Sequence, residues 1–163
     1  MKGLNLKPGV VLILNFGLWP VIHLIAGYVA ARRPRSAFNP EKGIYRLRSF
    51  ELSGKIYERI GVKIWKKWLP DLGDFFKPGF PKKKLRSRDK DYLQTFYLET
   101  CRAEYAHWLT MSGVLPFWLW NEWWAALIML GYALAVNLPC IIVQRYNRGR
   151  LGLLFLEKLR KGI

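Results

Sequence analysis

The residues best suited to chemistry lie between Glu99 and Trp108, where two carboxylates, an arginine and a histidine fall within three helical turns. Glu104 and His107 are three residues apart, so on a helix their side chains are close enough to hydrogen-bond. The carboxylate could orient the imidazole and raise its basicity, which would let the other ring nitrogen remove a proton from a hydroxyl. We therefore take His107 as the candidate general base and Glu104 as the residue that orients it. Glu99 and Arg102 would fix the helix or a bound donor.

Two other interpretations fit the same residues. Glu99, Arg102 and Glu104 could form an ion-pair network that closes the packing of the helix, with His107 only snorkelling or capping. Glu99, Glu104 and His107 could also hold a metal, as in carboxylate-bridged bundles, but no second motif of that kind follows and we expect no metal. Cys101 lacks a cysteine partner at metal-like spacing, so neither a zinc site nor a disulfide framework is expected.

A second cluster begins at Asn137 and Pro139 and continues through a basic run from Gln144 to Arg150. Pro139 removes a backbone donor and frees a carbonyl, so a local break there could shape a pocket. The functional interpretation is that arginines hold the phosphates of an activated donor, that amides add hydrogen bonds, and that some of these groups stabilise an oxyanion. These candidate donor-binding residues are Arg102, Asn137, Gln144, Arg145, Asn147 and Arg148. The alternative is a polybasic anchor to anionic lipids.

The elements that must position both clusters are apolar. The chain has 163 residues, is 52% hydrophobic and carries a net charge of +16, so its apolar and basic residues must be segregated. Three apolar stretches are each near the roughly 20 residues that cross a bilayer, namely about 10–31, 103–120 and 123–143. The sequence therefore predicts an all-α integral membrane protein with about three transmembrane helices.

The first stretch could instead be a signal peptide, because Lys2 and Lys7 precede it. It ends in Arg32, Arg33 and Pro34, which is a stop-transfer flank without a small-residue cleavage site. We therefore expect it to be retained as a membrane span.

The distribution of charge predicts the topology. All basic residues except Lys2 and Lys7 fall in residues 32–102 and 144–163, and basic flanks stay in the cytosol. We expect a single multi-pass domain over residues 1–163 in the cell membrane, with the N-terminus outside. Residues 32–102 and the tail 144–163 would be cytosolic, and a helical hairpin would turn at Asn121 and Glu122.

The cytosolic segment contains one amphipathic pattern, from Ser53 to Leu69, which predicts a helix lying on the inner leaflet. Lys82 to Lys90 is expected to be an exposed basic run, and another helix could start at about Asp91. At about 1.5 Å per residue, His107, Asn137 and His23 fall at a similar depth near the cytosolic leaflet.

The chain resembles the glycosyl-4,4'-diaponeurosporenoate acyltransferase family, the enzymes of the last step in staphyloxanthin-type carotenoid synthesis. Two blocks carry the resemblance: Glu99 to Trp108, and Asn137 to Pro139 followed by Ile142 to Leu151. Weaker matches are Gly54-Lys55, Trp65-Lys66, Leu69 to Asp71, and Arg32 with Pro34. His23 belongs to no recognised motif, and whether it takes part stays open.

The resemblance implies transfer of a fatty acyl group to a sugar hydroxyl of a glycosylated membrane lipid, either a glycosyl carotenoid or a related glycolipid. The donor would be acyl-CoA or an acyl carrier protein, each drawn to the basic face, and no cofactor is expected. A rival mechanism uses Cys101 as an acyl-accepting nucleophile, although the neighbouring carboxylates disfavour a thiolate. The alternative function is a non-enzymatic membrane scaffold that binds anionic phospholipids. Nucleic acid binding is disfavoured, because lipid phosphates would compete for the same charges.

Overall fold

The computed structural model describes Leu4, residues 6–69, Arg86, Ser87 and residues 89–161, and every regular element in them is helical. The long helices are α1 (Pro8–Arg32), α4 (Lys90–Ser112) and α5 (Trp123–Lys161). The short ones are η1 (Arg35–Ala37), η2 (Gly43–Tyr45), η3 (Ser49–Glu51), α2 (Lys55–Arg59), α3 (Val62–Trp65), η4 (Lys66–Trp68) and η6 (Leu115–Leu119). The predicted all-α class is confirmed.

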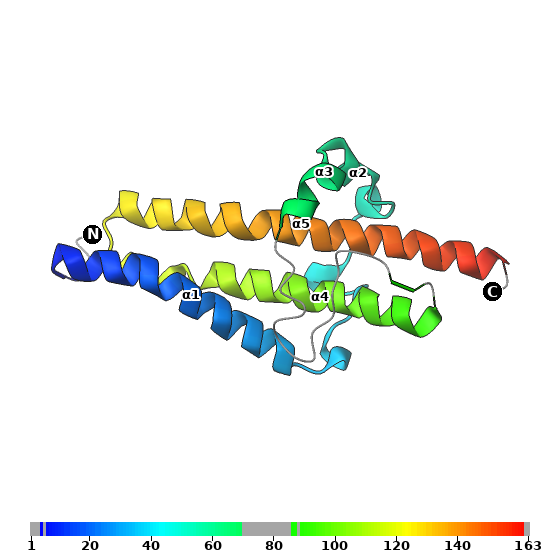
Figure 1. The fold of residues 1–163 in the computed structure, drawn as a ribbon, viewed down its shortest axis with the longest axis horizontal. Coiled ribbons are helices and arrows are strands. Elements are labelled where there is room, and N and C mark those ends of the chain that lie inside the picture. Colours follow the sequence, from blue (N-terminus) through cyan, green and yellow to red (C-terminus); the bar gives the residue numbers. More distant parts are fainter. Residues whose placement is uncertain (1–3, 5, 70–85, 88, 162–163) are drawn as a thin grey trace.

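The three long helices form an elongated bundle in which α5 runs most of the length of the molecule (Figure 1). α4 packs against α5 along an extensive interface and against α1 along a smaller one. α4 begins where Asp89 accepts hydrogen bonds from the Asp91 and Tyr92 amides, a side-chain cap that satisfies two otherwise unpaired N–H groups. The predicted start near Asp91 is therefore confirmed.

A hydrophobic cluster and an amide pair join α1 to the turn before α5. Trp19 of α1 packs with Phe117 and Ala133, which are both fully buried. Beside them, the buried side chains of Asn15 and Asn121 exchange two hydrogen bonds of 2.8 Å. The predicted turn at Asn121 and Glu122 is present, since α5 begins at the next residue.

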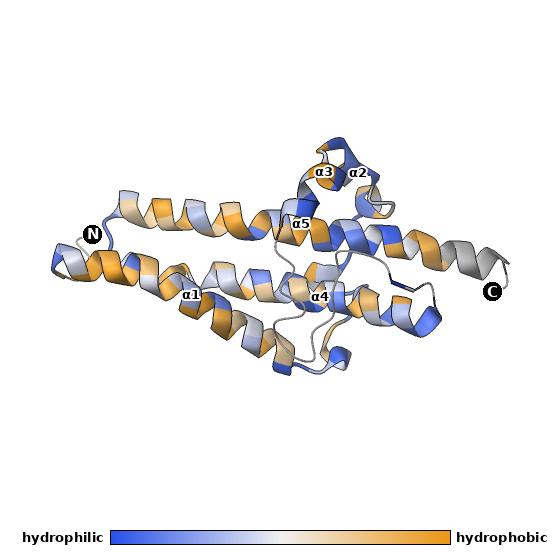
Figure 2. Cartoon of the chain, viewed as in Figure 1, coloured by the Kyte–Doolittle hydropathy of each residue, from blue (hydrophilic) through white to orange (hydrophobic). Residues whose placement is uncertain are grey.

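The predicted span 103–120 is not a single apolar helix. α4 ends at Ser112, and Pro116 falls at the start of the separate η6. Proline lacks the N–H that helix continuation needs, and α4 also carries buried carboxylates. Within the described residues, only α1 and the Trp123–Phe155 part of α5 are long and apolar enough to cross a membrane, so a third such helix is not shown. Figure 2 shows apolar residues concentrated on α1 and the first part of α5.

The predicted continuous helix from Ser53 to Leu69 was wrong. The segment is broken into α2, α3 and η4, and Gly54 and Gly61 precede α2 and α3 with φ of 71° and 72°. These left-handed conformations are open to glycine at little steric cost, and they interrupt the helix. The fragments form a lobe beside α5, which we call the α2–η4 lobe (residues 53–69; Figure 1).

The local break suggested at Pro139 is absent, because α5 continues through it to Lys161, and residues 144–161 of the predicted cytosolic tail belong to the same helix. One missing backbone hydrogen bond does not end a helix whose next turns are packed, and Leu151 packs against Leu93 and Phe96 of α4. The predicted basic run from Lys82 to Lys90 falls largely outside the described residues.

Candidate functional site

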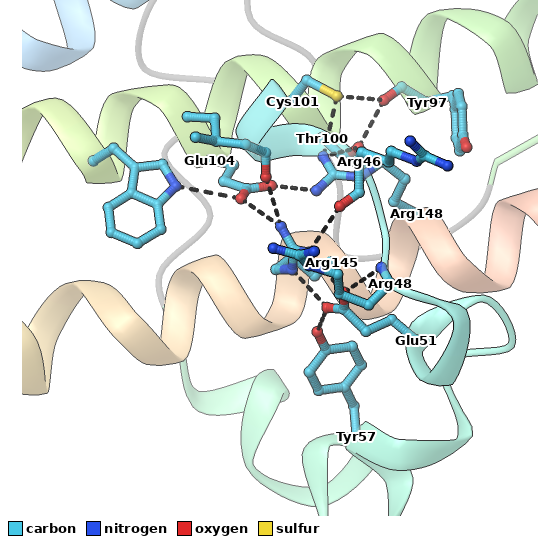
Figure 3. Close-up of polar contacts among 12 residues, drawn as sticks. Arg46, Arg48, Glu51, Tyr57, Tyr97, Thr100, Cys101, Glu104, Arg145 and Arg148 are labelled. Atoms are coloured by element: carbon cyan, nitrogen blue, oxygen red, sulfur yellow. Dashed lines mark hydrogen bonds and ion pairs between the residues drawn. The ribbon is translucent and has the colours of Figure 1, made fainter. Parts of the chain in front are cut away.

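The centre of the candidate site is Glu104, a fully buried carboxylate on α4. It forms ion pairs with Arg148 and, at 3.0 Å, with Arg145, both from α5 (Figure 3). Trp108, one turn along α4, donates its indole N–H to Glu104 Oε1 at 3.3 Å. Burial of a carboxylate is tolerated when cations and donors surround it, and that condition is met here.

Arg148 is fully buried between the two helices. Besides Glu104, its Nη1 donates to Thr100 Oγ1 at 3.4 Å and lies 3.1 Å from Cys101 Sγ. The sequence predicted Arg148 as a ligand for donor phosphates. In the structure its guanidinium is a buried counterion of Glu104, so a phosphate could bind it only by displacing that carboxylate.

Arg145 links α5 to the segment that precedes the α2–η4 lobe. Its Nε and Nη2 donate to the two carboxylate oxygens of Glu51, each at 2.7 Å. It also donates to the backbone carbonyls of Ile44 at 2.9 Å and Arg46 at 3.2 Å. Arg145 therefore contacts three separate parts of the chain, counting Glu104.

Glu51 is buried and is held as an anion by its neighbours. Burial raises its pKa, but hydrogen bonds from Arg145, from the Tyr57 hydroxyl and from the Arg48 amide outweigh this and lower the pKa to about 2. Burial and the adjacent Glu51 raise the pKa of Tyr57 to about 12. Tyr57 is therefore protonated at neutral pH and acts as a hydrogen-bond donor.

His107 lies one turn from Glu104, and its Nδ1 is 3.0 Å from Oδ1 of the fully buried Asn137. Asn137 Nδ2 donates to the Ala133 carbonyl at 2.9 Å, which fixes the amide so that its oxygen faces the imidazole. An amide oxygen only accepts hydrogen bonds, so this contact requires a proton on Nδ1 of His107. This contact places His107 and Asn137 at one level of the bundle, and their depth in a membrane stays a prediction.

The predicted pairing of Glu99 with Arg102 is present, at 2.7 Å. Glu99 also pairs with Arg35 at 3.2 Å, and Arg102 donates to the Arg33 carbonyl at 3.0 Å. These contacts fasten the C-terminal end of α1 to α4, so Glu99 and Arg102 lie at the α1–α4 junction.

The remaining predicted residues are distributed along α4, α5 and α1. Gln144 and Asn147 are buried, and Gln144 Oε1 has no hydrogen-bond partner among the described residues. Cys101 is fully buried, and burial raises the pKa of its thiol. His23 lies beside Trp19, with Nδ1 2.8 Å from the Trp19 carbonyl oxygen, and its neighbour Ile22 lies against Gly113. Gly113 directly follows the end of α4 and is six residues from His107, so His23 lies away from His107, contrary to the predicted common depth.

The sequence analysis missed Glu51, Tyr57, Trp108 and Arg35. Glu51 had one available signal: it is a lone carboxylate in a stretch with Arg46, Arg48 and Lys55. Its partner Arg145 is 94 residues away, so the pairing itself could not be inferred. Among the described residues, no group of three or more His, Cys, Asp or Glu side chains is arranged to hold a metal ion.

Residues 40–156 match the family model described as glycosyl-4,4'-diaponeurosporenoate acyltransferase. A protein of that name from Staphylococcus aureus (strain Newman) is 31% identical over 147 residues, which cover 88% of this chain and 87% of the relative. Another, from Staphylococcus haemolyticus (strain JCSC1435), is 28% identical over 140 residues, covering 85% of this chain and 81% of the relative. No solved structure matches the chain.

These matches include both sequence blocks that surround Glu104, His107, Asn137 and Arg148, and they confirm the resemblance drawn from those blocks. The chain belongs to the glycosyl-4,4'-diaponeurosporenoate acyltransferase family, whose name indicates an acyltransferase.

Proposed function

We propose that this chain is a membrane acyltransferase that moves a fatty acyl group from a thioester donor to a sugar hydroxyl of a glycosylated lipid. The acceptor would be a glycosyl carotenoid or a related glycolipid, as the names of the relatives suggest. The donor would be acyl-CoA or an acyl carrier protein. The observation that carries the assignment of a catalytic residue is the His107–Asn137 contact, because it gives the chain an oriented imidazole.

The chemistry follows from the protonation of that imidazole. With Nδ1–H bonded to Asn137, Nε2 would accept the proton of the acceptor hydroxyl while the hydroxyl oxygen attacks the thioester carbonyl. The tetrahedral intermediate would then expel the thiolate, which takes the proton back from the imidazolium. The ester forms, the thioester breaks, and the free thiol leaves without a covalent enzyme intermediate.

Glu104 would act here through position. Its carboxylate is held by Arg145 and Arg148, which fix α4 against α5 one turn from His107. A rigid supporting network is what a catalytic group needs in order to hold its geometry. Glu104 is accordingly proposed as a positioning residue.

Donor binding would fall to the polar groups at the cytosolic end of α5, including Gln144 and Asn147. The guanidinium groups of Arg145 and Arg148 already bind carboxylates, so a phosphate would have to displace these partners. The exposed side chains of Arg46, Arg48 and Arg150 adjoin the same network and are accessible to a soluble donor. We propose them as the first contacts for phosphates or for an acidic carrier protein.

A membrane location is supported by the outer faces of α1 and α5. Ile13 and Phe16 of α1 are each 72% exposed, and Leu127, Ile128 and Val136 of α5 are also exposed. Such apolar surface is costly in water and is satisfied by lipid tails.

The test is acyl transfer from labelled acyl-CoA or acyl carrier protein to a panel of glycolipids by purified protein in detergent. Removing a general base costs about a hundredfold or more, so His107→Ala and His107→Gln should lose at least that much rate while keeping the wild-type melting profile. His23→Gln is the matched control, because it changes the chain's other histidine, and it should retain activity.

Cys101→Ala separates the two mechanisms. Direct attack by the acceptor predicts that this variant keeps most of its activity, and a folded but inactive Cys101→Ala protein would favour the covalent route. Wild-type transfer that is indifferent to His107 would refute the assigned base, and no transfer from either donor would favour the scaffold alternative.

A further inference from the structure

The α2–η4 lobe exposes a stripe of large apolar side chains that have basic residues next to them in the sequence. Ile60, Ile64 and Trp68 recur at four-residue intervals and are 55%, 63% and 77% exposed. An exposed basic residue directly precedes each of them in the sequence, namely Arg59, Lys63 and Lys67. We call these six residues the lobe surface.

The three side chains of this stripe do not form the hydrophobic core of the lobe. Val62, between Ile60 and Ile64, is fully buried and supplies the inward contact. Three large apolar side chains that remain outside a packed lobe indicate that the exposed side has its own partner.

The lobe is fixed to α5 directly beyond the segment predicted to span the membrane, residues 123–143. Gly54 lies against Tyr146, Lys66 places its ammonium group 4.8 Å from the centre of the Tyr146 ring, and the Tyr146 hydroxyl donates to Glu58 at 3.4 Å. Together with the Glu51–Arg145 pair, these contacts hold the lobe at one level of the bundle.

That level coincides with the end of α1. α1 ends at Arg32, and the next carbonyl, that of Arg33, accepts a hydrogen bond from Arg102 of α4. If α1 and α5 span a bilayer, its inner surface lies near these residues, and the lobe projects sideways from the bundle near that height (Figure 1). Figure 2 shows apolar and hydrophilic residues side by side on α2 and α3.

We propose that the lobe surface binds the anionic inner surface of the membrane. Ile60, Ile64 and Trp68 enter the headgroup region, where tryptophan is favoured, while basic side chains contact lipid phosphates. Lys63 pairs with Glu58 at 2.9 Å, so Arg59 and Lys67 carry most of the attraction. The inference rests on the proposed membrane location and not on the proposed chemistry.

The test places a nitroxide at Ile64→Cys or Trp68→Cys in a Cys140→Ala background, since Cys101 is fully buried and will not label. The accessibility of the nitroxide to oxygen and to an aqueous nickel complex is measured by spin relaxation. The protein is placed in nanodiscs of phosphatidylcholine, with or without one third phosphatidylglycerol. We expect the labels to be shielded from nickel several-fold more strongly in the anionic discs, and less so at high salt.

Charge reversal supplies the matched comparison. Each basic residue near an anionic surface contributes about a fivefold factor in binding, so Arg59→Glu and Lys67→Glu should each reduce the shielding by at least that factor. Lys42→Glu makes the same charge change at an exposed position outside the lobe surface and should have no effect.

Labels that stay equally accessible to nickel in both kinds of disc would overturn the proposal. Dipolar broadening between labels on two copies would overturn it in favour of a dimer interface. Arg59→Glu and Lys67→Glu should keep full transferase activity in detergent, where no anionic surface exists. If His107 proved not to be the base, the labelling result would therefore be unchanged. Failure of the catalytic assignment can thus be distinguished from failure of the membrane-binding proposal.

Discussion

The charges of two buried carboxylates are neutralised by two guanidinium groups in the polar network between α4 and α5. Glu104 and Glu51 are the anions, Arg145 and Arg148 are the cations, and Arg145 contacts both carboxylates. Balanced charges avoid the large cost of burying an unpaired ion, so the network is expected to be sensitive to removal of one member.

Arg148 provides the test of that sensitivity. Arg148→Met leaves Glu104 short of its buried counterion and should destabilise the protein by about 3–5 kcal/mol. The double variant Arg148→Met, Glu104→Gln removes the charge as well and should regain much of that loss. Thermal and denaturant unfolding in detergent measure both, and a double variant no more stable than the single one would contradict the counterion role.

The pH dependence of stability tests Glu51. Its pKa is lowered from an ordinary 4.5 to about 2 in the fold, so its stabilising contribution is complete above about pH 4.5 and is lost as the pH falls toward 2. Glu51→Gln should be less stable than wild type at pH 7, and the difference should shrink through that acid range. Glu41→Gln, at an exposed carboxylate, should follow the wild-type curve, and a constant difference between Glu51→Gln and wild type would refute the lowered pKa.

Single residues could be predicted from the sequence where their partners are local. Glu99 and Arg102 are three residues apart, and they do pair. His107 and Asn137 could be placed at one depth by counting residues, although their hydrogen bond could not be foreseen. Arg145 was assigned to phosphates because its carboxylate partner Glu51 lies in a different part of the sequence.

At the scale of elements, the lengths of the apolar stretches predicted α1 and the start of α5 well, whereas hydrophobic periodicity failed where glycine intervened. The pattern from Ser53 to Leu69 fits one helix, but it contains Gly61, which adopts a left-handed conformation in the lobe. Periodicity records which residues are apolar and says nothing about backbone conformation, so it could not reveal the break. The opposite error occurred at Pro139, where packing of α5 against α4 carries the helix through a residue that usually interrupts it.

A substitution at Gly149 of α5 tests how the turn formed by residues 51–54 packs on this helix. A Cβ at this position would lie 2.6 Å from the Glu51 carbonyl oxygen and 2.9 Å from the Gly54 nitrogen, both backbone atoms. Gly149→Ala should therefore push the 51–54 turn away, loosen the Glu51–Arg145 pair and cost about 1–3 kcal/mol. Faster hydrogen exchange in residues 44–59 would report the loss directly.

Gly152 is the matched control on the same helix, since a Cβ there meets nothing within 4 Å. Gly152→Ala should leave exchange in residues 44–59 unchanged and should stabilise α5 slightly, because alanine is the better helix former. Equal hydrogen exchange and equal stability of the two variants would show that the close approach at Gly149 does not restrict the side chain at that position.

At the scale of the whole molecule, the contacts give the bundle two distinct ends. The Asn15–Asn121 pair and the Leu4–Leu119 backbone hydrogen bond bring the turn before α5 to the N-terminal end of α1. The ion pairs of Glu99 gather at the other end of α1. The part of α4 from Glu99 onward and η6 therefore lie alongside α1, even though α4 is too polar to qualify as an apolar span.

This arrangement makes the orientation of the chain testable. Because 25 of the 27 basic residues lie in residues 32–102 and 144–163, those segments should stay in the cytosol, and the turn at Glu122 should face outward with the N-terminus. In a Cys140→Ala background, a membrane-impermeant maleimide should label Glu122→Cys in intact cells and Ser49→Cys only after permeabilisation. The reverse pattern would place the basic network outside. Labelling of both sites in intact cells would mean that the turn and the basic segments share one side, in which case α4 and η6 do not carry the chain across the bilayer.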